Sequence, residues 1–529
     1  MSATHVVIAP MLAALVTAIA TVLTRKWPRV QRAASLAGVV AYAVGVATLA
    51  SRVGFDGIVT YQLSNWPAPF GITLVADALS TFMLSLTAVV SLAALVFSVF
   101  YVDAYAQRVS YHPLFHFMLV GVTGAFLTGD VFNLFVWFEV MLMPSYVFVV
   151  FYSGPEHTSA ALKYTVLNLV GSAVMLLAIG GLYATTGTLN MADLARRLAA
   201  AGEFGIDPAP VLGLAALLFT VFALKAGIVP FQFWVPESYS AAPAPISAML
   251  AGVTKKVGIY AIVRLYFTIF AAATLPAGLG LPGLSGSSFL AFFGPVLFLM
   301  SVGSIFLGGL GAVSRPNLDR VFAYSSIGQV GFIVLPLAVA ATVPAVRVVG
   351  IVAALVYALN HALAKSLLFM VSGRVHETVG SIDFEDLGGL TGQQPYLSGA
   401  FFVGALALVG IPPLTGFFGK ALVFDTAGRA LVDGGAFAGV ALAVALAGAI
   451  LTIAYLSRAW NLGFWGEAST AVIEGPSSPR LDAVLVGLAL LVVIAGVGFD
   501  PVYQFAHAAA TAALARADYV HAVGPEVVG

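Results

Sequence analysis

Residues 224–231 read Leu-Lys-Ala-Gly-Ile-Val-Pro-Phe, inside an apolar run that covers residues 209–234. A run of this length can cross a bilayer, because a membrane-spanning helix takes about 20 apolar residues. Lys225 is unusual there, since a lysine within the membrane costs a few kcal/mol. Pro230 is unusual too, because proline interrupts the hydrogen bonds of a helix. The stretch therefore predicts a broken membrane helix with a buried charge, the arrangement at the ion sites of secondary transporters.

The composition of the whole chain is that of a membrane protein. Of its 529 residues, 60% are hydrophobic and 9% are charged, whereas a soluble domain carries about 25% charged residues. The net charge is zero and no basic tract occurs, so we expect no nucleic-acid partner. Cysteine is absent, which excludes disulfides and thiolate metal sites. We expect no cofactor.

Fourteen apolar stretches predict membrane spans, and the fold class that they predict is an all-α polytopic membrane protein. Spans of a β-barrel would be shorter and would alternate between apolar and polar residues. The predicted spans are roughly residues 5–24, 33–50, 75–101, 114–128, 131–152, 160–184, 209–234, 242–271, 289–313, 321–341, 347–372, 396–425, 436–465 and 483–505.

The charges around the first span predict its orientation. The apolar run of residues 6–23 is followed by Arg25, Lys26, Arg29 and Arg32, whereas a signal peptide has its charge in front. The predicted inward connections then carry more Lys and Arg than the outward ones, as the positive-inside rule requires. We expect both termini to lie outside the cytoplasm.

The same order of lysine-bearing and proline-broken spans occurs twice along the chain. A lysine-bearing span near His157 precedes the broken span of Lys225, and a second lysine-bearing span precedes one with Lys420 and the pair Pro412 and Pro413. The matching spans are five apart, an odd number, which predicts inverted repeats with broken helices. The expected division is residues 1–104 (spans one to three), 112–271 (first five-helix repeat), 289–466 (second, inverted five-helix repeat) and 480–529 (last span and extracytoplasmic tail).

Six of the seven lysines fall inside predicted spans, and Lys26 alone lies in a loop. A lysine near the end of a span can reach the lipid headgroups. For Lys163 this explanation is as good as a role in function. That alternative is poor for Lys225 and Lys365, which lie deep in their spans. Lys420 lies toward the end of its span, but the double proline favours a break that lines a cavity.

A buried lysine is a usable proton carrier because burial disfavours its charged form and a nearby carboxylate favours it. Arginine is not, because it stays charged. The carboxylate that we expect to act on Lys225 is Glu139, which has apolar neighbours on both sides. The alternative is a structural glutamate paired with an arginine, for which Arg264 is the main candidate.

The span around residue 361 carries a second polar group. His361 and Lys365 are four residues apart and therefore share a helical face, with Asn360 beside them. A lone histidine would be an ordinary packed residue, but one turn from a buried lysine it indicates a hydrated polar track. Lys255 and Lys256 are adjacent and point about 100° apart, so we expect one of them to face the track.

Several stretches between residues 60 and 466 resemble the D-subunit family of the multisubunit Mrp sodium/proton antiporters, which is related to the antiporter-like membrane subunits of respiratory complex I. The stretches that carry the resemblance are NWPAPFGI (65–72), FEV (138–140), LKAGIVPF (224–231), SYSAAP (238–243), KVGIY (256–260), AYSSIGQ (323–329), NHALAK (360–365), GIPPLTGFFGK (410–420) and FWGE (464–467).

The resemblance implies a proton relay of Glu139, Lys225, Lys256, His361, Lys365 and Lys420 through water at the membrane midplane. Lys163 and Lys255 are possible accessory residues, and Pro230, Pro412 and Pro413 are the helix breaks. The resemblance also implies a bacterial plasma-membrane location and assembly with about six other Mrp subunits. H⁺ and Na⁺ would be the ions transported by that complex.

Two other function classes stay open at this point. One is a proton-pumping subunit of a quinone-linked NADH dehydrogenase or membrane hydrogenase. The other is a non-transporting membrane scaffold, which has no reason to keep costly buried charges. No cluster of oxygen ligands for sodium is recognisable, so we assign this chain to proton transport and expect a transporter subunit that is not an enzyme.

Overall fold

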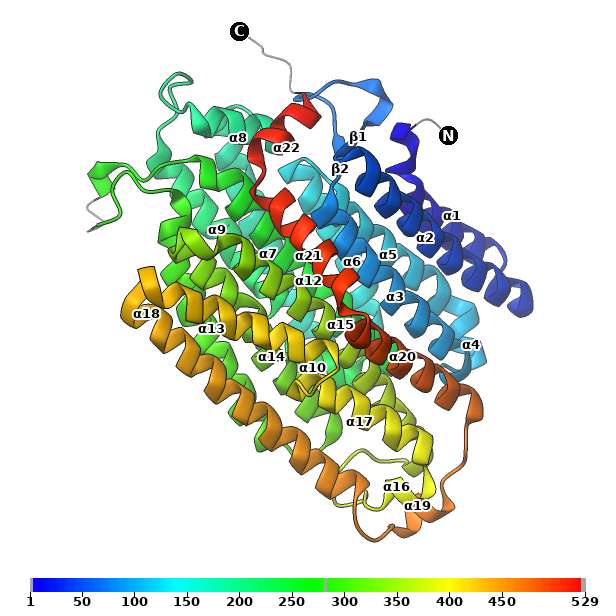
Figure 1. Cartoon of the computed structure of the whole chain (residues 1–529). Coiled ribbons are helices and arrows are strands. Elements are labelled where there is room, and N and C mark those ends of the chain that lie inside the picture. The colour runs from blue at the N-terminus through cyan, green and yellow to red at the C-terminus, as the bar shows by residue number, and fades with distance from the viewer. Residues whose placement is uncertain (1–2, 280–282, 525–529) are drawn as a thin grey trace.

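The computed structural model describes residues 3–279 and 283–524, most of which lie in helices that form one bundle (Figure 1). Among these residues, eleven helices are long and apolar enough to cross a membrane, by length and composition. They are α2 (Pro28–Asp56), α3 (Ala78–Tyr101), α6 (Val131–Val149), α7 (Pro155–Thr186), α9 (Pro208–Ala226), the helix Ala244–Ala272, α13 (Phe289–Val313), α14 (Leu318–Thr342), the helix Pro344–Val379 that contains α15 (Arg347–Val379), the helix Thr415–Phe464 that contains α18 (Thr415–Ala459), and α20 (Pro479–Val497).

Eleven is fewer than the fourteen spans expected, for identifiable reasons. The stretches 5–24 and 114–128 form α1 (Ala9–Leu23) and α5 (His112–Leu127), which have 15 and 16 residues. The stretch 396–425 divides into α17 (Pro395–Val409) and the start of α18. Helix α18 also contains the stretch 436–465 up to residue 459, after a bend at Gly435, whose φ is 48°. The helix is therefore interrupted at residues 410–414, inside the expected span 396–425. It is not interrupted between residues 425 and 436, where we expected one span to end and the next to begin.

The remaining elements are short. A two-stranded antiparallel hairpin of β1 (Val59–Gln62) and β2 (Thr73–Ala76) connects α2 to α3, and its second strand begins just ahead of the span that we expected at 75–101. The other short elements are η1 (Ala3–Val6), η2 (Leu63–Asn65), α4 (Ala104–Ala106), η3 (Gln107–Tyr111), α8 (Met191–Ala199), α10 (Val235–Ala241), η7 (Ala277–Leu279), η8 (Pro344–Val346), α16 (Leu390–Gln393), η9 (Trp460–Phe464), α19 (Thr470–Glu474), α21 (Phe499–Leu514) and α22 (Arg516–Val523).

The helix boundaries follow ordinary capping chemistry. Asp77 and Asp130 cap α3 and α6 by accepting hydrogen bonds from the backbone N–H groups of Ser80 and Asn133, which are among the donors that a helix start leaves unpaired. Helices α7 and α9 begin at prolines, where the missing N–H costs nothing. In a membrane such helices are required, because every backbone polar group must be paired internally.

The helix Ala244–Ala272 is the most interior of the eleven, with its whole most apolar window buried. Helix α14 is almost as enclosed, and α15 packs against it. The β-hairpin, α8 and α22 lie at the same end of the bundle as the N-terminus, while α16 and α19 lie at the opposite end (Figure 1). A charged side chain at the middle of the helix Ala244–Ala272 therefore has no direct route to lipid.

Candidate functional site

Five of the six lysines within apolar helices are buried. Lys255, Lys256 and Lys365 have no exposed surface, and Lys225 and Lys420 are 2% and 4% exposed. Lys163 differs: it is exposed and forms an ion pair of 2.7 Å with Glu237. A surface ion pair of this kind contributes little to stability. The structure thus separates Lys163 from the buried group.

Lys256 and His361 meet in the interior. The Lys256 ammonium (Nζ) lies 2.5 Å from Nδ1 of His361 and 2.8 Å from the carbonyl oxygen of Ala251. On the other side of the ring, Nε2 lies 3.1 Å from the hydroxyl of Ser326. While Lys256 is charged it can only donate, and in that state Nδ1 of His361 accepts and Nε2 carries the ring proton toward Ser326. The ring thus has one nitrogen facing a proton donor and the other facing a hydroxyl.

Lys365 lies one turn further along α15 and faces α14. Its ammonium donates to the carbonyl oxygen of Phe322 at 3.0 Å and to the hydroxyl of Ser325. Ser325 and Ser326 are adjacent in α14, so neighbouring hydroxyls contact Lys365 and His361. The polar group that we expected around residue 361 is therefore shared between α14, α15 and the helix Ala244–Ala272.

Polar contacts continue along α14 toward α18. Gln329, one turn after Ser325, donates to the hydroxyls of Tyr455 and Thr452 at 2.7 and 3.0 Å. Its side-chain oxygen accepts a hydrogen bond from Tyr357. Rings, hydroxyls and amides of this kind rigidify an interior when all of them are paired.

The two helix breaks share one design. Helix α9 ends at Ala226 and α17 at Val409, and each is followed by a glycine with positive φ, Gly227 (65°) and Gly410 (92°). A Cβ on Gly227 would lie 3.0 Å from Cε of Lys255, and one on Gly410 would lie 3.0 Å from Cδ of Lys420. Each glycine thus leaves room for a lysine side chain at a helix C-terminus.

At the second break Lys420 completes the helix end. Its ammonium donates to the carbonyl oxygen of Val409 at 3.0 Å, one of the acceptors that the end of α17 leaves unpaired. A cation is also stabilised there by the helix dipole. Asn360 supports the same break, because it donates to the carbonyl oxygen of Ala407 at 3.3 Å and accepts from Thr415 at 2.8 Å.

At the first break Lys225 is the penultimate residue of α9. Its ammonium is buried, makes no hydrogen bond to the described residues and lies 5.8 Å from the centre of the Tyr164 ring. Lys225 and Glu139 share no direct hydrogen bond or ion pair in the described structure. Glu139 is only partly buried and accepts a hydrogen bond from Ser172. Helices α6 and α9 both pack against α7, and it is Ser172 of α7 that binds the carboxylate.

Arg264 is not the partner of Glu139 either. Its guanidinium forms a buried ion pair with Asp77, so the alternative that made Glu139 a structural partner of Arg264 is excluded. Asp77 was not among the residues that we singled out, although an aspartate just ahead of an apolar run with a serine three residues later is a recognisable helix cap. Ser325, Ser326 and Gln329 lie in the stretch 323–329 that carries the family resemblance, but they were given no role in the site. Ser172 was missed, because a single hydroxyl in an apolar helix carries no local signal.

Among residues 3–279 and 283–524, no group of three or more histidine, aspartate and glutamate side chains could hold a metal ion. The buried polar residues around Lys256, His361 and the two breaks are lysines, one histidine, hydroxyls and amides. These groups accept, donate and pass protons. What the arrangement offers chemically is therefore a series of protonatable side chains across the interior of the bundle.

Comparisons with known proteins show which proteins this chain is similar to. The family described as "NADH:quinone oxidoreductase/Mrp antiporter, TM" matches residues 128–445. The D-subunit of the Na⁺/H⁺ antiporter of Alkalihalophilus pseudofirmus is 35% identical over 98% of this chain and 99% of its own length. NADH-quinone oxidoreductase subunit N of Desulforudis audaxviator is 36% identical over 75% of this chain and 74% of its own length. A chain of the Mrp complex from Dietzia sp. DQ12-45-1b superposes with a TM-score of 0.86 and 25% identity, over 99% of this chain and 100% of that chain.

Proposed function

This chain belongs to the NADH:quinone oxidoreductase/Mrp antiporter transmembrane family, and from that premise we propose that it is the proton-translocating subunit of a multisubunit Na⁺/H⁺ antiporter. The observation that carries the proposal is the Lys256–His361 contact, because it joins the buried lysines of the two halves of the chain. The relay consists of Glu139, Lys225, Lys256, His361, Lys365 and Lys420. Lys255 is an accessory residue beside the first break, and water completes the gaps between the side chains.

The architecture that we propose has fourteen spans and two inverted five-helix repeats, over residues 112–271 and 289–466. The two breaks support it, because each has a glycine of positive φ and a buried lysine against it. The bend at Gly435 supports the count of fourteen spans, since it divides the long helix α18 into two parts that we take as the ends of two different spans. We place the chain in the bacterial plasma membrane with both termini outside the cytoplasm and with the other Mrp subunits as its partners.

The second candidate is an antiporter-like subunit of a quinone-linked respiratory complex, which the relative named NADH-quinone oxidoreductase subunit N favours. The antiporter is the better supported of the two, because the match to its D-subunit covers almost the whole of both chains. A scaffold without transport is the least supported, because five buried lysines are costly to keep inside apolar helices.

One experiment distinguishes the three. The complex that co-purifies with this chain is reconstituted in vesicles and assayed for Na⁺-dependent proton movement and for quinone reduction. We expect Na⁺/H⁺ exchange by the whole complex, none by this chain alone, and no quinone reduction. Quinone reduction would favour the second candidate, and an assembled complex that exchanges normally with Lys256→Ala and Lys225→Ala would favour the scaffold.

A further inference from the structure

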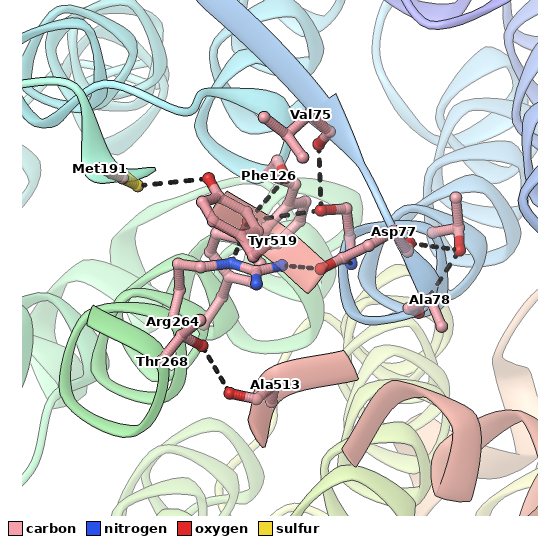
Figure 2. Close-up of polar contacts among 12 residues, drawn as sticks. Val75, Asp77, Ala78, Phe126, Met191, Arg264, Thr268, Ala513 and Tyr519 are labelled. Atoms are coloured by element: carbon pink, nitrogen blue, oxygen red, sulfur yellow. Dashed lines mark hydrogen bonds and ion pairs between the residues drawn. The ribbon is translucent and has the colours of Figure 1, made fainter. Parts of the chain in front are cut away.

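Asp77 and Arg264 form an ion pair that the proposed relay does not use. Nη2 of Arg264 donates to Oδ2 of Asp77 at 2.5 Å, and both side chains are 1% exposed. Figure 2 shows the Arg264 side chain extending to Asp77 below the ring of Tyr519. A buried ion pair is costly to desolvate, and ionisable residues within membrane helices commonly serve function. The pair therefore requires a role.

Each partner is fixed by further contacts. Oδ1 of Asp77 accepts the backbone N–H of Ser80 at 2.9 Å, so the carboxylate is held at the start of α3. The Arg264 guanidinium lies 5.6 Å from the centre of the Tyr260 ring and 4.9 Å from that of Tyr519 in α22. The Tyr260 hydroxyl donates in turn to the carbonyl oxygen of Phe126 at 2.8 Å. The ion pair thus joins two groups that are each held by further contacts.

The helix that carries Arg264 needs such an anchor because it is irregular. Within Ala244–Ala272, the regular helix α12 (Lys255–Ile262) follows α11 (Ala244–Met249) and lies between two π-helical segments, η4 (Leu250–Thr254) and η5 (Val263–Ile269). A π turn holds more residues than an α turn and occurs often at functional sites. If either segment relaxed to α-helix by one residue, the residues on one side would rotate by about 100° relative to the other.

Such a rotation would separate Lys256 from His361. Lys256 is the second residue of α12 and therefore lies next to the first π-helical segment, whereas Arg264 lies in the second segment. At the first segment, Lys256 itself donates to Ala251. At the second segment, Thr268 donates to the carbonyl oxygen of Ala513 at 2.6 Å (Figure 2). Arg264 forms the only ion pair that η5 makes in the described structure, with Asp77 at the start of α3.

We propose that Asp77 and Arg264 are positioning residues of the relay: their ion pair holds η5, and with it α12, in the register that places Lys256 against His361. The inference rests on the proposed function, because it takes the Lys256–His361 contact to be part of the proton path.

The test uses the whole complex in vesicles, with exchange measured per assembled complex over a range of pH. The main variant is the double substitution Asp77→Asn/Arg264→Gln, which leaves no unpaired charge in the interior. The second is Arg264→Lys, which keeps the charge but not the fork of donors. The control is Arg52→Gln/Asp56→Asn, which removes an exposed ion pair of 2.5 Å on α2.

We expect the double variant to exchange at least about 10-fold more slowly and to shift the pH of half-maximal exchange by about half a unit or more, because the groups that face Lys256 (His361, Lys255 and Lys365) set its protonation. Arg264→Lys should give a smaller shift, and the control none. A merely structural role would reduce the amount of assembled complex and leave the pH profile of the remainder unchanged.

An unchanged rate, or a lower rate with an unchanged pH profile, overturns the inference. If the double variant does not assemble, Arg264→Lys decides in the same way: a shifted profile supports the inference and an unshifted one overturns it. Lys256→Ala, measured alongside, separates the two proposals. If that variant exchanges normally, the relay itself is wrong; if it is inactive while the double variant is normal, the positioning role alone is wrong.

Discussion

The side-chain nitrogen of Lys256 lies 2.5 Å from Nδ1 of His361, a residue 105 positions further along the chain. The contact brings the helix Ala244–Ala272, which packs beside the first break, against α15, which also carries Lys365. A proton on either side chain has the other within hydrogen-bond distance. In the proposed relay, the two residues are therefore the link between the two halves of the chain.

Lys255 and Lys256 should respond differently to the same substitution. Lys256→Ala removes the partner of His361, and we expect exchange to fall by about 100-fold, the size of effect that a positioned proton donor has. Lys255→Ala removes a side chain packed against Gly227 and should cost less than about 10-fold. Exchange in vesicles, normalised to assembled complex, measures both. A larger loss for Lys255→Ala would reverse the assignment of the two residues.

Lys225 should require a side chain that can both gain and lose a proton. We expect Lys225→Ala and Lys225→Arg to abolish exchange in an assembled complex, because alanine carries no proton and arginine does not release its own. Lys26→Ala, in the first loop, is the control and should leave exchange unchanged. Near-normal exchange by Lys225→Arg would show that this lysine has a structural role.

The hydrogen bond from Ser172 to Glu139 allows the role of this carboxylate in exchange to be tested in two steps of different size. Glu139→Gln removes the charge and should lower exchange strongly. Ser172→Ala keeps the charge but removes one hydrogen bond to it, a change of about 1.5–3 kcal/mol, so exchange should fall to an intermediate level. The matched control is Ser85→Ala in α3, whose hydroxyl bonds only to its own helix backbone at Thr81. Equal exchange by Ser172→Ala and the parent would contradict a role for this contact.

The pH dependence of stability should change at Asp130, which caps α6 from outside the helix. Burial raises the pKa of its carboxyl from 3.8 to about 6, against the opposing effect of the backbone N–H groups of Asn133 and Phe132. Because the folded-state pKa is the higher one, the contribution of this group to stability is complete below pH 4 and is lost as the pH rises through 6. Two pKa units correspond to about 3 kcal/mol.

Asp130→Asn keeps an oxygen that can accept the N–H of Asn133 but removes the ionisation. We therefore expect the variant complex to melt at a higher temperature than the parent, with a gain that grows between pH 5 and pH 7 and then levels off. Intrinsic fluorescence during heating measures it. A gain of the same size at pH 5 and pH 8 would show that ionisation of Asp130 does not limit stability.

The sequence was most informative where a residue is costly in its surroundings. Lys225, Lys365 and Lys420 could be singled out because lysine is rare in apolar runs, and the breaks could be located because proline and glycine have few other uses there. The helical, multi-span character of the fold followed from the length of those runs. All of these are local properties.

Contacts between distant helices could not be predicted in the same way. Arg264 was noticed as a buried cation, but choosing between Glu139 and Asp77 as its partner requires knowing which helices are neighbours. Ser172 was invisible for the same reason. The count of spans differed because α1, α5 and α17 are short and because α18 continues through the connection that we expected between residues 425 and 436, with only a bend at Gly435.

The contacts of Arg264 and Thr268 have a consequence for biogenesis. Asp77 leaves the ribosome 187 residues before Arg264, but Ala513, which accepts from Thr268, follows 245 residues after that threonine. The helix with two buried lysines and an arginine is therefore synthesised well before the segment that closes over it. Insertion of this helix and completion of its surroundings are separate events in time. A nascent chain that ended after the helix Ala244–Ala272 would hold its two buried lysines and its arginine without the segment that finishes their packing.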